Sequence, residues 1–234
     1  QLNSQLDRSV NFVEEQLVGF IESRFVRKCD EYFIAYLSSQ TGCNRGCAFC
    51  HLTATGQTSF TDSSHNDFVA QAIQVFKHYR KQAKPAKYMH YNFMARGEPL
   101  ANKIMIDSGD ELLLKLGQVA KDEGLPSKFN VSTIMPTTLK KSLVDIFNCV
   151  TPTLYYSLYS VDPVWRKKWM PSAMDHTTAL EMLKEYQMSD RYATYYISTR
   201  PCKDWRGEEI NVQKLMLLLD MDMLANNKMA YHVN

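Results

Sequence analysis

Short apolar segments of strand character alternate with amphipathic helical segments along most of the chain. The strand-like segments are residues 32–37, 87–94, 128–133, 153–159, 192–199 and 228–233. Helical spacing of apolar side chains follows at 67–82, 108–122, 137–148, 175–188 and 210–224. Such alternation predicts an α/β fold with a parallel sheet, either doubly wound or curled into a barrel. In both arrangements ligands bind at the carboxyl ends of the strands.

The first 31 residues do not follow this alternation. We expect a helix near 9–22, and the apolar runs on either side of residues 27–31 predict a hairpin that leads into the strand at 32–37. The chain therefore divides into an N-terminal extension at 1–31, made of a helix and a hairpin, and a core domain at 32–234.

Composition favours one large core. The chain has 234 residues, 45% of them hydrophobic, and its 27 basic and 25 acidic residues give a net charge of +2, so charge balance alone does not indicate a nucleic-acid binder. There is no apolar run of about eighteen residues and no signal-peptide pattern, which predicts a soluble, cytoplasmic protein without a membrane partner. The ends at Gln1 and Asn234 leave open a longer natural chain.

Three cysteines lie in eight positions directly after the strand at 32–37. Their spacing is C-x3-C-x2-C, at Cys43, Cys47 and Cys50. A chain of this size does not need a disulfide framework, and a structural zinc site wants a fourth ligand that is hard to nominate here. Three thiolates suit a [4Fe–4S] cluster whose fourth iron stays open for a small molecule. The other cysteines are expected to be buried free thiols: Cys29, Cys149 and Cys202.

This three-cysteine motif resembles that of the radical S-adenosylmethionine (SAM) superfamily. Together with "GEPL" (97–100), "VST" (131–133) and "SLYS" (157–160), it resembles the RlmN/Cfr family, radical SAM methyltransferases of adenine in ribosomal and transfer RNA. The resemblance runs from about Glu22 to the end of the chain. It implies a partial (β/α)6 radical-SAM barrel that binds a [4Fe–4S] cluster through the three cysteines.

The resemblance also implies a SAM site. The matching positions that would contact SAM are Gly97, Glu98, Ser132, Ser157 and Tyr159, the last standing where the family has histidine, and Phe49 would cover the cofactor. Taken singly, a strand-end hydroxyl is more often a helix cap, and Phe49 has a plain packing alternative.

One departure from the family concerns the first strand. Methyl transfer in that family uses a methyl-carrier cysteine on this strand and a second cysteine near the C-terminus. The carrier position is Tyr36 here, and no cysteine matches the second. A phenol cannot replace a thiolate as methyl acceptor. We therefore expect a divergent homologue in which Tyr36 is a substrate contact, a hydrogen-atom relay, or a simple filler of the vacant space.

Substrate contacts are predicted where basic and aromatic residues mix. Trp165 and Lys167 lie in "WRKKW" (165–169), and Arg200 could clamp a carboxylate or phosphate. The alternative for each is an ordinary solvated surface. A second basic stretch at 76–87 has the same two interpretations.

Three functions follow from these motifs. The first is a radical SAM enzyme that cleaves SAM reductively to a 5′-deoxyadenosyl radical and abstracts hydrogen from a nucleotide, nucleic acid or small metabolite, with a flavodoxin or ferredoxin as electron donor. The second is an RNA adenine methyltransferase with an unusual mechanism. The third is a non-catalytic iron–sulfur or zinc protein.

Overall fold

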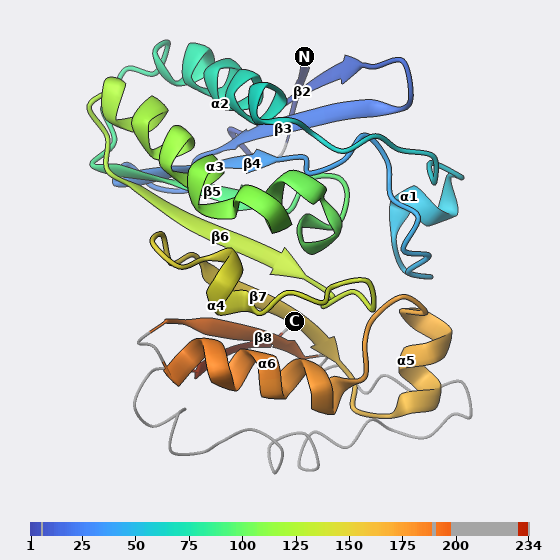
Figure 1. Cartoon of the computed structure of the whole chain (residues 1–234). Helices are drawn as coiled ribbons and strands as arrows, with labels where there is room; N and C mark the ends of the chain where they lie inside the picture. Colours follow the sequence, from blue (N-terminus) through green and yellow to red (C-terminus); the bar gives the residue numbers. More distant parts are fainter. Residues whose placement is uncertain (6, 189–190, 198–228, 234) are drawn as a thin grey trace.

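The structure, a computed structural model, describes residues 1–5, 7–188, 191–197 and 229–233 (Figure 1). Within these residues one sheet holds nine strands in chain order. Its antiparallel part consists of β1 (Leu2–Asn3), β2 (Val10–Glu15) and β3 (Phe20–Val26), and β3 pairs antiparallel with β4.

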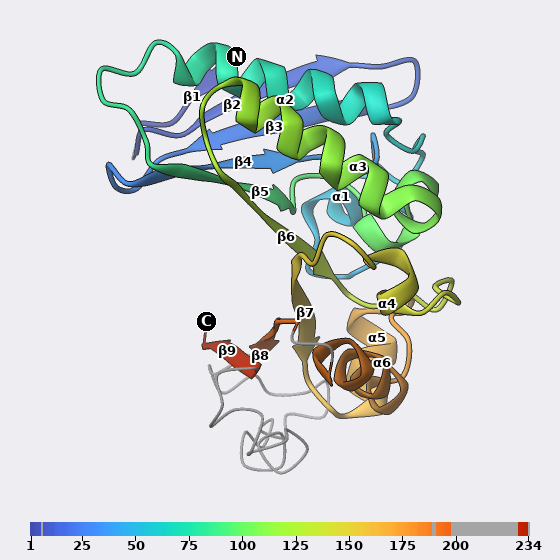
Figure 2. The same ribbon diagram turned by 60° about the vertical axis from the view of Figure 1, so that its left-hand side comes forward.

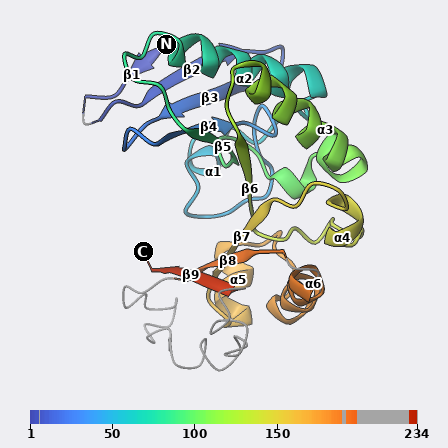
Figure 3. The ribbon, with the colours of Figure 1, turned by 90° about the vertical axis from the view of Figure 1, so that its left-hand side faces the viewer.

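The remaining strands run parallel in chain order, which confirms the predicted β/α core. They are β4 (Tyr32–Leu37), β5 (Tyr88–Phe93), β6 (Ser127–Thr133), β7 (Thr153–Tyr159), β8 (Ala193–Ile197) and β9 (Met229–Val233). Figures 2 and 3 show that this part of the sheet curls, as expected for a partial (β/α)6 barrel.

The longer helices cover the outer face of the curled sheet (Figure 2). They are α2 (His65–Tyr79), α3 (Lys103–Asp122) and α6 (His176–Met188), with the short α4 (Leu143–Ile146) between them. Ser64 and Asp67 form a capping box that starts α2. Three further short elements follow strand ends: α1 (His51–Ala54), the 3-10 turn η1 (Pro99–Ala101) and α5 (Pro163–Trp169). The helix expected at 210–224 lies outside the described residues.

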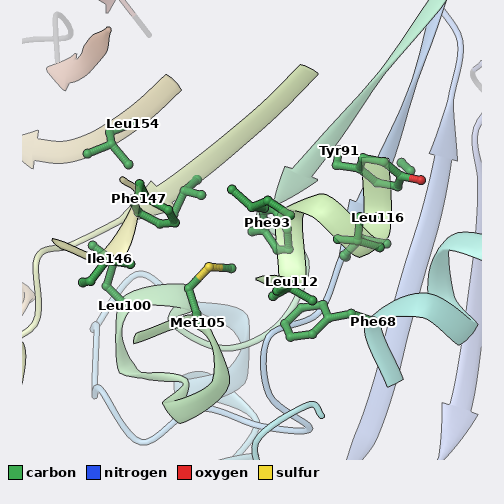
Figure 4. Close-up of a cluster of buried hydrophobic side chains, with 14 of the residues drawn as sticks. Phe68, Tyr91, Phe93, Leu100, Met105, Leu112, Leu116, Ile146, Phe147 and Leu154 are labelled. Carbon is green, nitrogen blue, oxygen red and sulfur yellow. The ribbon is translucent and has the colours of Figure 1, made fainter. Parts of the chain in front are cut away.

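The apolar core lies between the sheet and these helices. Figure 4 shows Tyr91 and Phe93 of β5 packed toward Phe68 of α2 and Leu112 of α3, and all four side chains are fully buried. Because side chains alternate along a strand, the intervening residues point to the opposite, inner face of the sheet. That inner face carries polar residues such as Asn92 and Asn130.

The helix predicted near 9–22 is wrong. This segment forms strands β2 and β3, joined by a turn in which the amide of Gln16 donates to the carbonyl of Gly19, whose φ is +75°. Val10 and Phe12 on β2 and Ile21 and Phe25 on β3 are buried at alternate positions, so the strand period accounts for apolar residues that also fit a helical period. The predicted hairpin around 27–31 is confirmed by the β3–β4 pairing.

The helix predicted at 137–148 is mostly wrong, because only Leu143–Ile146 is helical. The residues before it are held by extended contacts instead: Pro136 forms a β-bridge with Ala173, and the amide of Thr137 donates to the carbonyl of Ser172. These contacts pull the chain toward α5 and prevent an earlier helix start. The division of the chain at residue 32 stays a prediction.

No helix among the described residues combines the length and the apolar character that crossing a bilayer requires.

Candidate cofactor site

The three cysteines lie on a long loop between β4 and α2, at the carboxyl end of the parallel strands. Gly42 allows the loop to fold onto itself, since a Cβ there would lie 2.2 Å from the carbonyl oxygen of Ser59. Cys43 donates its amide to the carbonyl of Gln57, closing the loop. Position and backbone path therefore agree with a cofactor-binding loop.

Arg96 anchors this loop from the end of β5. Its guanidinium is buried and donates to the carbonyl oxygen of Thr41 and to the side-chain oxygen of Gln57. The Arg96 carbonyl in turn accepts from the amides of Ser39 and Gln40. Both ends of the cysteine loop are thus tied to one residue next to the Gly97–Glu98 pair.

The cysteine side chains interact electrostatically with one another. Burial, reinforced by the negative charges of Cys43 and Glu98, raises the pKa of Cys47 to about 12. Burial also raises the pKa of Cys43. For Cys43 this effect of burial outweighs the opposing charge of Arg45. A bound metal cluster would instead favour the thiolates.

The donor set suits the predicted cluster in its chemistry. Cys43, Cys47 and Cys50 are free thiols on one loop, as an iron–sulfur cluster requires. In the described residues, however, no group of three candidate ligands is gathered closely enough to hold a metal ion. The residues fit the group, and the loop would have to draw the sulfurs together around it.

Gly97 and Glu98 lie directly beneath the loop. Gly97 has φ +88°, and a Cβ there would lie 2.6 Å from the side chains of Ser39 and Gln40, so only glycine fits. The Glu98 carboxylate is buried and accepts hydrogen bonds from the amides of Leu100 and Ile134. Burial raises its pKa despite these bonds and that from Thr133.

Tyr159 ends β7 beside the cysteine loop. Its ring packs edge-on against Phe49, with 5.2 Å between ring centroids, and burial together with the charge of Cys47 raises its phenol pKa. Its φ of +53° is unusual for a tyrosine and coincides with a register shift after Ser157. Strained backbone of this kind concentrates at functional sites.

The predicted substrate residues of α5 divide into two kinds. Trp165 is only 7% exposed and packs with Cys47, Ile134 and Met170, stacked on the ring of Trp169. In this arrangement it forms part of the wall of the cysteine loop and presents no free face. Lys167 is exposed on the same helix.

Ser132 and Tyr36 lie on the inner face of the sheet. The Ser132 hydroxyl is buried and has no hydrogen-bond partner among the described residues. Tyr36 is half-buried and interacts electrostatically with Tyr155.

Four chain segments far apart in sequence thus meet at one end of the barrel: the cysteine loop and the ends of β5, β6 and β7. Arg200 and Cys202 lie outside the described residues. The expectation of buried thiols is wrong for Cys29 and Cys149, which are exposed, because each lies in a turn between elements.

The residues that support the loop were not among those predicted from the sequence. Arg96 directly precedes the Gly-Glu pair, and Gln40 lies three residues before Cys43. Gln40 accepts from the amide of Glu98 and donates to Asp62. Asn102 donates to the carbonyls of Ser39 and Ser63. The only signal in the sequence for these three residues was that they lie close to the cysteine motif or to the Gly97–Glu98 pair.

No protein-family model matches the chain. Among curated proteins it is 29% identical over 213 residues to the probable dual-specificity RNA methyltransferase RlmN of Prochlorococcus marinus, covering 87% of this chain and 55% of that protein. The RlmN of Clostridium acetobutylicum, also described as probable, is 26% identical over 238 residues, covering 100% and 63%. The chain therefore spans less than two thirds of the length of these relatives.

Solved structures support the fold. The chain aligns to Streptococcus suis SuiB bound to its precursor peptide SuiA with a TM-score of 0.56 and 16% identity, and to SuiB bound to S-adenosylmethionine with a TM-score of 0.52 and 16% identity. Each alignment covers 87% of this chain and 38% of SuiB. The chain is thus similar in sequence to curated RlmN proteins and in fold to SuiB, which is consistent with a divergent RlmN/Cfr-like radical SAM protein.

Proposed function

We propose that this chain is a radical SAM enzyme whose cysteine loop binds a [4Fe–4S] cluster through Cys43, Cys47 and Cys50. The observation that carries the proposal is the meeting of this loop with Glu98 of the β5 end and Tyr159 of the β7 end, both close enough to influence the pKa of a loop cysteine or to be influenced by it. When bound, the cluster and SAM supply reductive cleavage to methionine and a 5′-deoxyadenosyl radical that abstracts hydrogen from the substrate.

The chain's own residues bind and orient the cofactor. Gly97 allows the end of β5 to approach the loop closely, and in this proposal Glu98 and Ser132 contact SAM. Ser157 and Tyr159 of β7 would contact SAM as well, and Phe49, which is 49% exposed, would cover it. The predicted substrate residues Lys167 and Arg200, and Tyr36 as a substrate contact or hydrogen-atom relay, belong to the same proposal, whereas Trp165 supports the cysteine loop from α5.

The test is anaerobic reconstitution with iron and sulfide, followed by reduction with dithionite in the presence of SAM. We expect bound iron and 5′-deoxyadenosine in the unchanged chain and in Cys29→Ala, and loss of both in Cys47→Ala. Cys29 is the matched control because it is an exposed thiol remote from the loop. If Cys47→Ala retains iron and cleaves SAM as well as the control, the loop is not the cluster site.

RNA methylation is a second candidate function, and the names of the curated relatives favour it. The two functions have different products. Formation of S-adenosylhomocysteine together with methylated RNA would indicate methyl transfer by a route that does not need a cysteine at position 36. Deoxyadenosine without methylated RNA would favour hydrogen abstraction alone.

The proposal includes a one-electron donor such as a flavodoxin or ferredoxin, a nucleotide or nucleic acid as one class of substrate, and a cytoplasmic location. A non-catalytic iron–sulfur protein is the remaining alternative. It would assemble a cluster and never cleave SAM under reducing conditions.

A further inference from the structure

Three polar side chains form a row across the inner face of the sheet, near the cofactor end. The strand register aligns Tyr36 of β4 with Asn92 of β5, and Asn92 with Asn130 of β6. The residue after each of them belongs to the apolar core on the outer face, so the three side chains point inward. We call Tyr36, Asn92 and Asn130 the inner row.

The hydrogen bond between the two asparagines leaves the Nδ2 of Asn92 available as a donor and the Oδ1 of Asn130 available as an acceptor. The side-chain amide of Asn130 donates to the Oδ1 of Asn92 at 2.7 Å and lies 3.2 Å from the Nδ1 of His90. In the described part of the chain, the Nδ2 of Asn92 and the Oδ1 of Asn130 form no hydrogen bond. The inner row therefore presents an N–H donor beside a carbonyl acceptor.

The inner face of strands β4 to β7 carries little charge. Strands β4 to β7 contain no acidic residue and one basic residue, Lys128, whose ammonium lies 5.2 Å from the centroid of the Tyr88 ring. Burial lowers the pKa of His90, which keeps its imidazole neutral near pH 7. On the β3 side of the row, Arg24 lies opposite Tyr36, and its guanidinium donates to the hydroxyl of Ser9. A charged group brought to Asn92 and Asn130, on the other side of Tyr36, would lose its hydration.

Flat aromatic rings line the same face. Tyr32 stacks on Tyr88 and on His90, with ring centroids 5.3 Å and 5.0 Å apart. Tyr155 interacts with both Tyr36 and Tyr32. Stacked rings favour planar ligands, because such ligands offer the largest contact area to them.

We propose that the inner row holds the reacting part of the substrate, and that this part is an uncharged planar ring or carboxamide whose edge carries an acceptor beside a donor. The donor of Asn92 and the acceptor of Asn130 would bind that edge, with Tyr36 beside them. This inference rests on the proposed function, since it concerns the substrate of the same barrel. A nucleobase and a small metabolite with an amide both have the required chemistry.

Paired probes test this chemistry by ligand-observed NMR titration of the anaerobically reconstituted protein with SAM. Nicotinamide is compared with nicotinate, which has the same ring and a carboxylate in place of the amide. Adenosine is compared with purine riboside, which lacks the amino donor. We expect nicotinamide or adenosine to bind at least tenfold more tightly than its partner, and the pair that shows the difference identifies the source of the group. Equal binding within both pairs, or no binding of any probe, overturns the inference.

The sharpest variant is Asn92→Asp. It preserves the oxygen that accepts from Asn130 and replaces only the free N–H donor with an anionic acceptor. We expect binding of the preferred probe to weaken at least tenfold, while Asn66→Asp, an exposed site on α2, leaves it unchanged. Unchanged binding in a folded Asn92→Asp overturns the assignment of the row. If Asn92→Asp does not fold, the probe pairs on the unchanged chain still decide.

Failure of this inference is separable from failure of the proposed function. SAM cleavage to deoxyadenosine is measured in the same preparations. If SAM is cleaved and no neutral probe is preferred, the function stands and the inner-row inference falls. If SAM is not cleaved and the neutral probe is still preferred, the inner row binds such a group and the radical chemistry is what fails.

Discussion

Gly97 is the residue on which the geometry of the site depends most. Its φ of +88° and the crowding by Ser39 and Gln40 combine two separate penalties for any side chain. We expect Gly97→Ala to lower the free energy of unfolding by about 2 to 4 kcal/mol, as the sum of left-handed strain and overpacking.

The matched control is Gly56→Ala, because Gly56 has φ +69° and a Cβ added there would meet nothing within 4 Å. It should cost only the backbone strain, about 1 kcal/mol. Urea unfolding of both variants measures the difference, and equal losses would show that Gly97 is not crowded.

Arg96 acts as a positioning residue for the cysteine loop. Arg96→Met would leave the carbonyl of Thr41 and the side chain of Gln57 without their donor, at a cost of about 1 to 3 kcal/mol. We expect faster alkylation of Cys47 by iodoacetamide in the metal-free protein, since the loop is released. Arg80→Met, which removes an exposed ion pair with Glu123, should leave the alkylation rate unchanged. Unchanged rates in both variants would argue against the anchoring role.

Tyr156 gives the fold a defined sensitivity to alkali. Burial raises its pKa to about 12 from a usual value of 10, so the unfolded chain loses this proton at lower pH than the folded chain does. Stability therefore falls as the pH rises from about 10 toward 12. Tyr156→Phe should show a smaller fall across that range, measured by urea unfolding at pH 9 and pH 11.

The control for this pH effect is Tyr192→Phe, because Tyr192 is 57% exposed. It should reproduce the unchanged chain at both pH values. If the free energy of unfolding of Tyr156→Phe falls between pH 9 and pH 11 as steeply as that of the control, other groups cause the alkaline sensitivity.

At the scale of elements, helix α5 is a wall of the cysteine loop more than a surface for substrate. The amide of Ala48 donates to the carbonyl of Trp169 at 2.9 Å, and Trp165 packs against Cys47. We expect Trp165→Ala to cost about 3 to 5 kcal/mol, as for other buried tryptophans. Lys167→Ala should stay within about 0.5 kcal/mol. Thermal unfolding distinguishes them, and a small loss for Trp165→Ala would restore it as an exposed stacking residue.

Elements with a strong period and clear borders were predictable from the sequence. The strand at 153–159 and the helix at 175–188 were placed within one residue, because their apolar residues fit one period and turn residues flank them. The apolar residues of segment 9–22 fit the helical period as well as the strand period. Strand pairing therefore decided its structure, because β3 pairs with β4. Contacts between residues distant in sequence, such as Pro136 with Ala173, likewise decided the structure of segment 137–148.

The candidate site was predictable where short motifs follow strands, as at Cys43 or Gly97. The supporting contacts were not, because Arg96 and Asn102 act through backbone carbonyls more than fifty residues away in the chain. The inner row depends on strand register, which places Asn92 beside Asn130 and cannot be derived from either segment alone.

At the scale of the whole molecule, the parallel strands bring the cysteine loop, Glu98 and Tyr159 to one end of a curled sheet. The inner face of β4 to β7 is polar and aromatic and carries little charge. The same arrangement separates two tasks. In the proposed function, cofactor binding depends on strand ends and loops, and substrate selection depends on residues within the strands. Variants in the inner row should therefore change substrate binding and leave iron content unchanged.

The central claim is that the three-cysteine loop holds a cluster with one iron open to SAM. Electron paramagnetic resonance of the dithionite-reduced, reconstituted protein, recorded with and without SAM, tests it most directly. We predict a reduced [4Fe–4S] signal that changes on addition of SAM and is absent in Cys47→Ala. A signal that SAM does not alter, or one that persists in Cys47→Ala, would contradict the account.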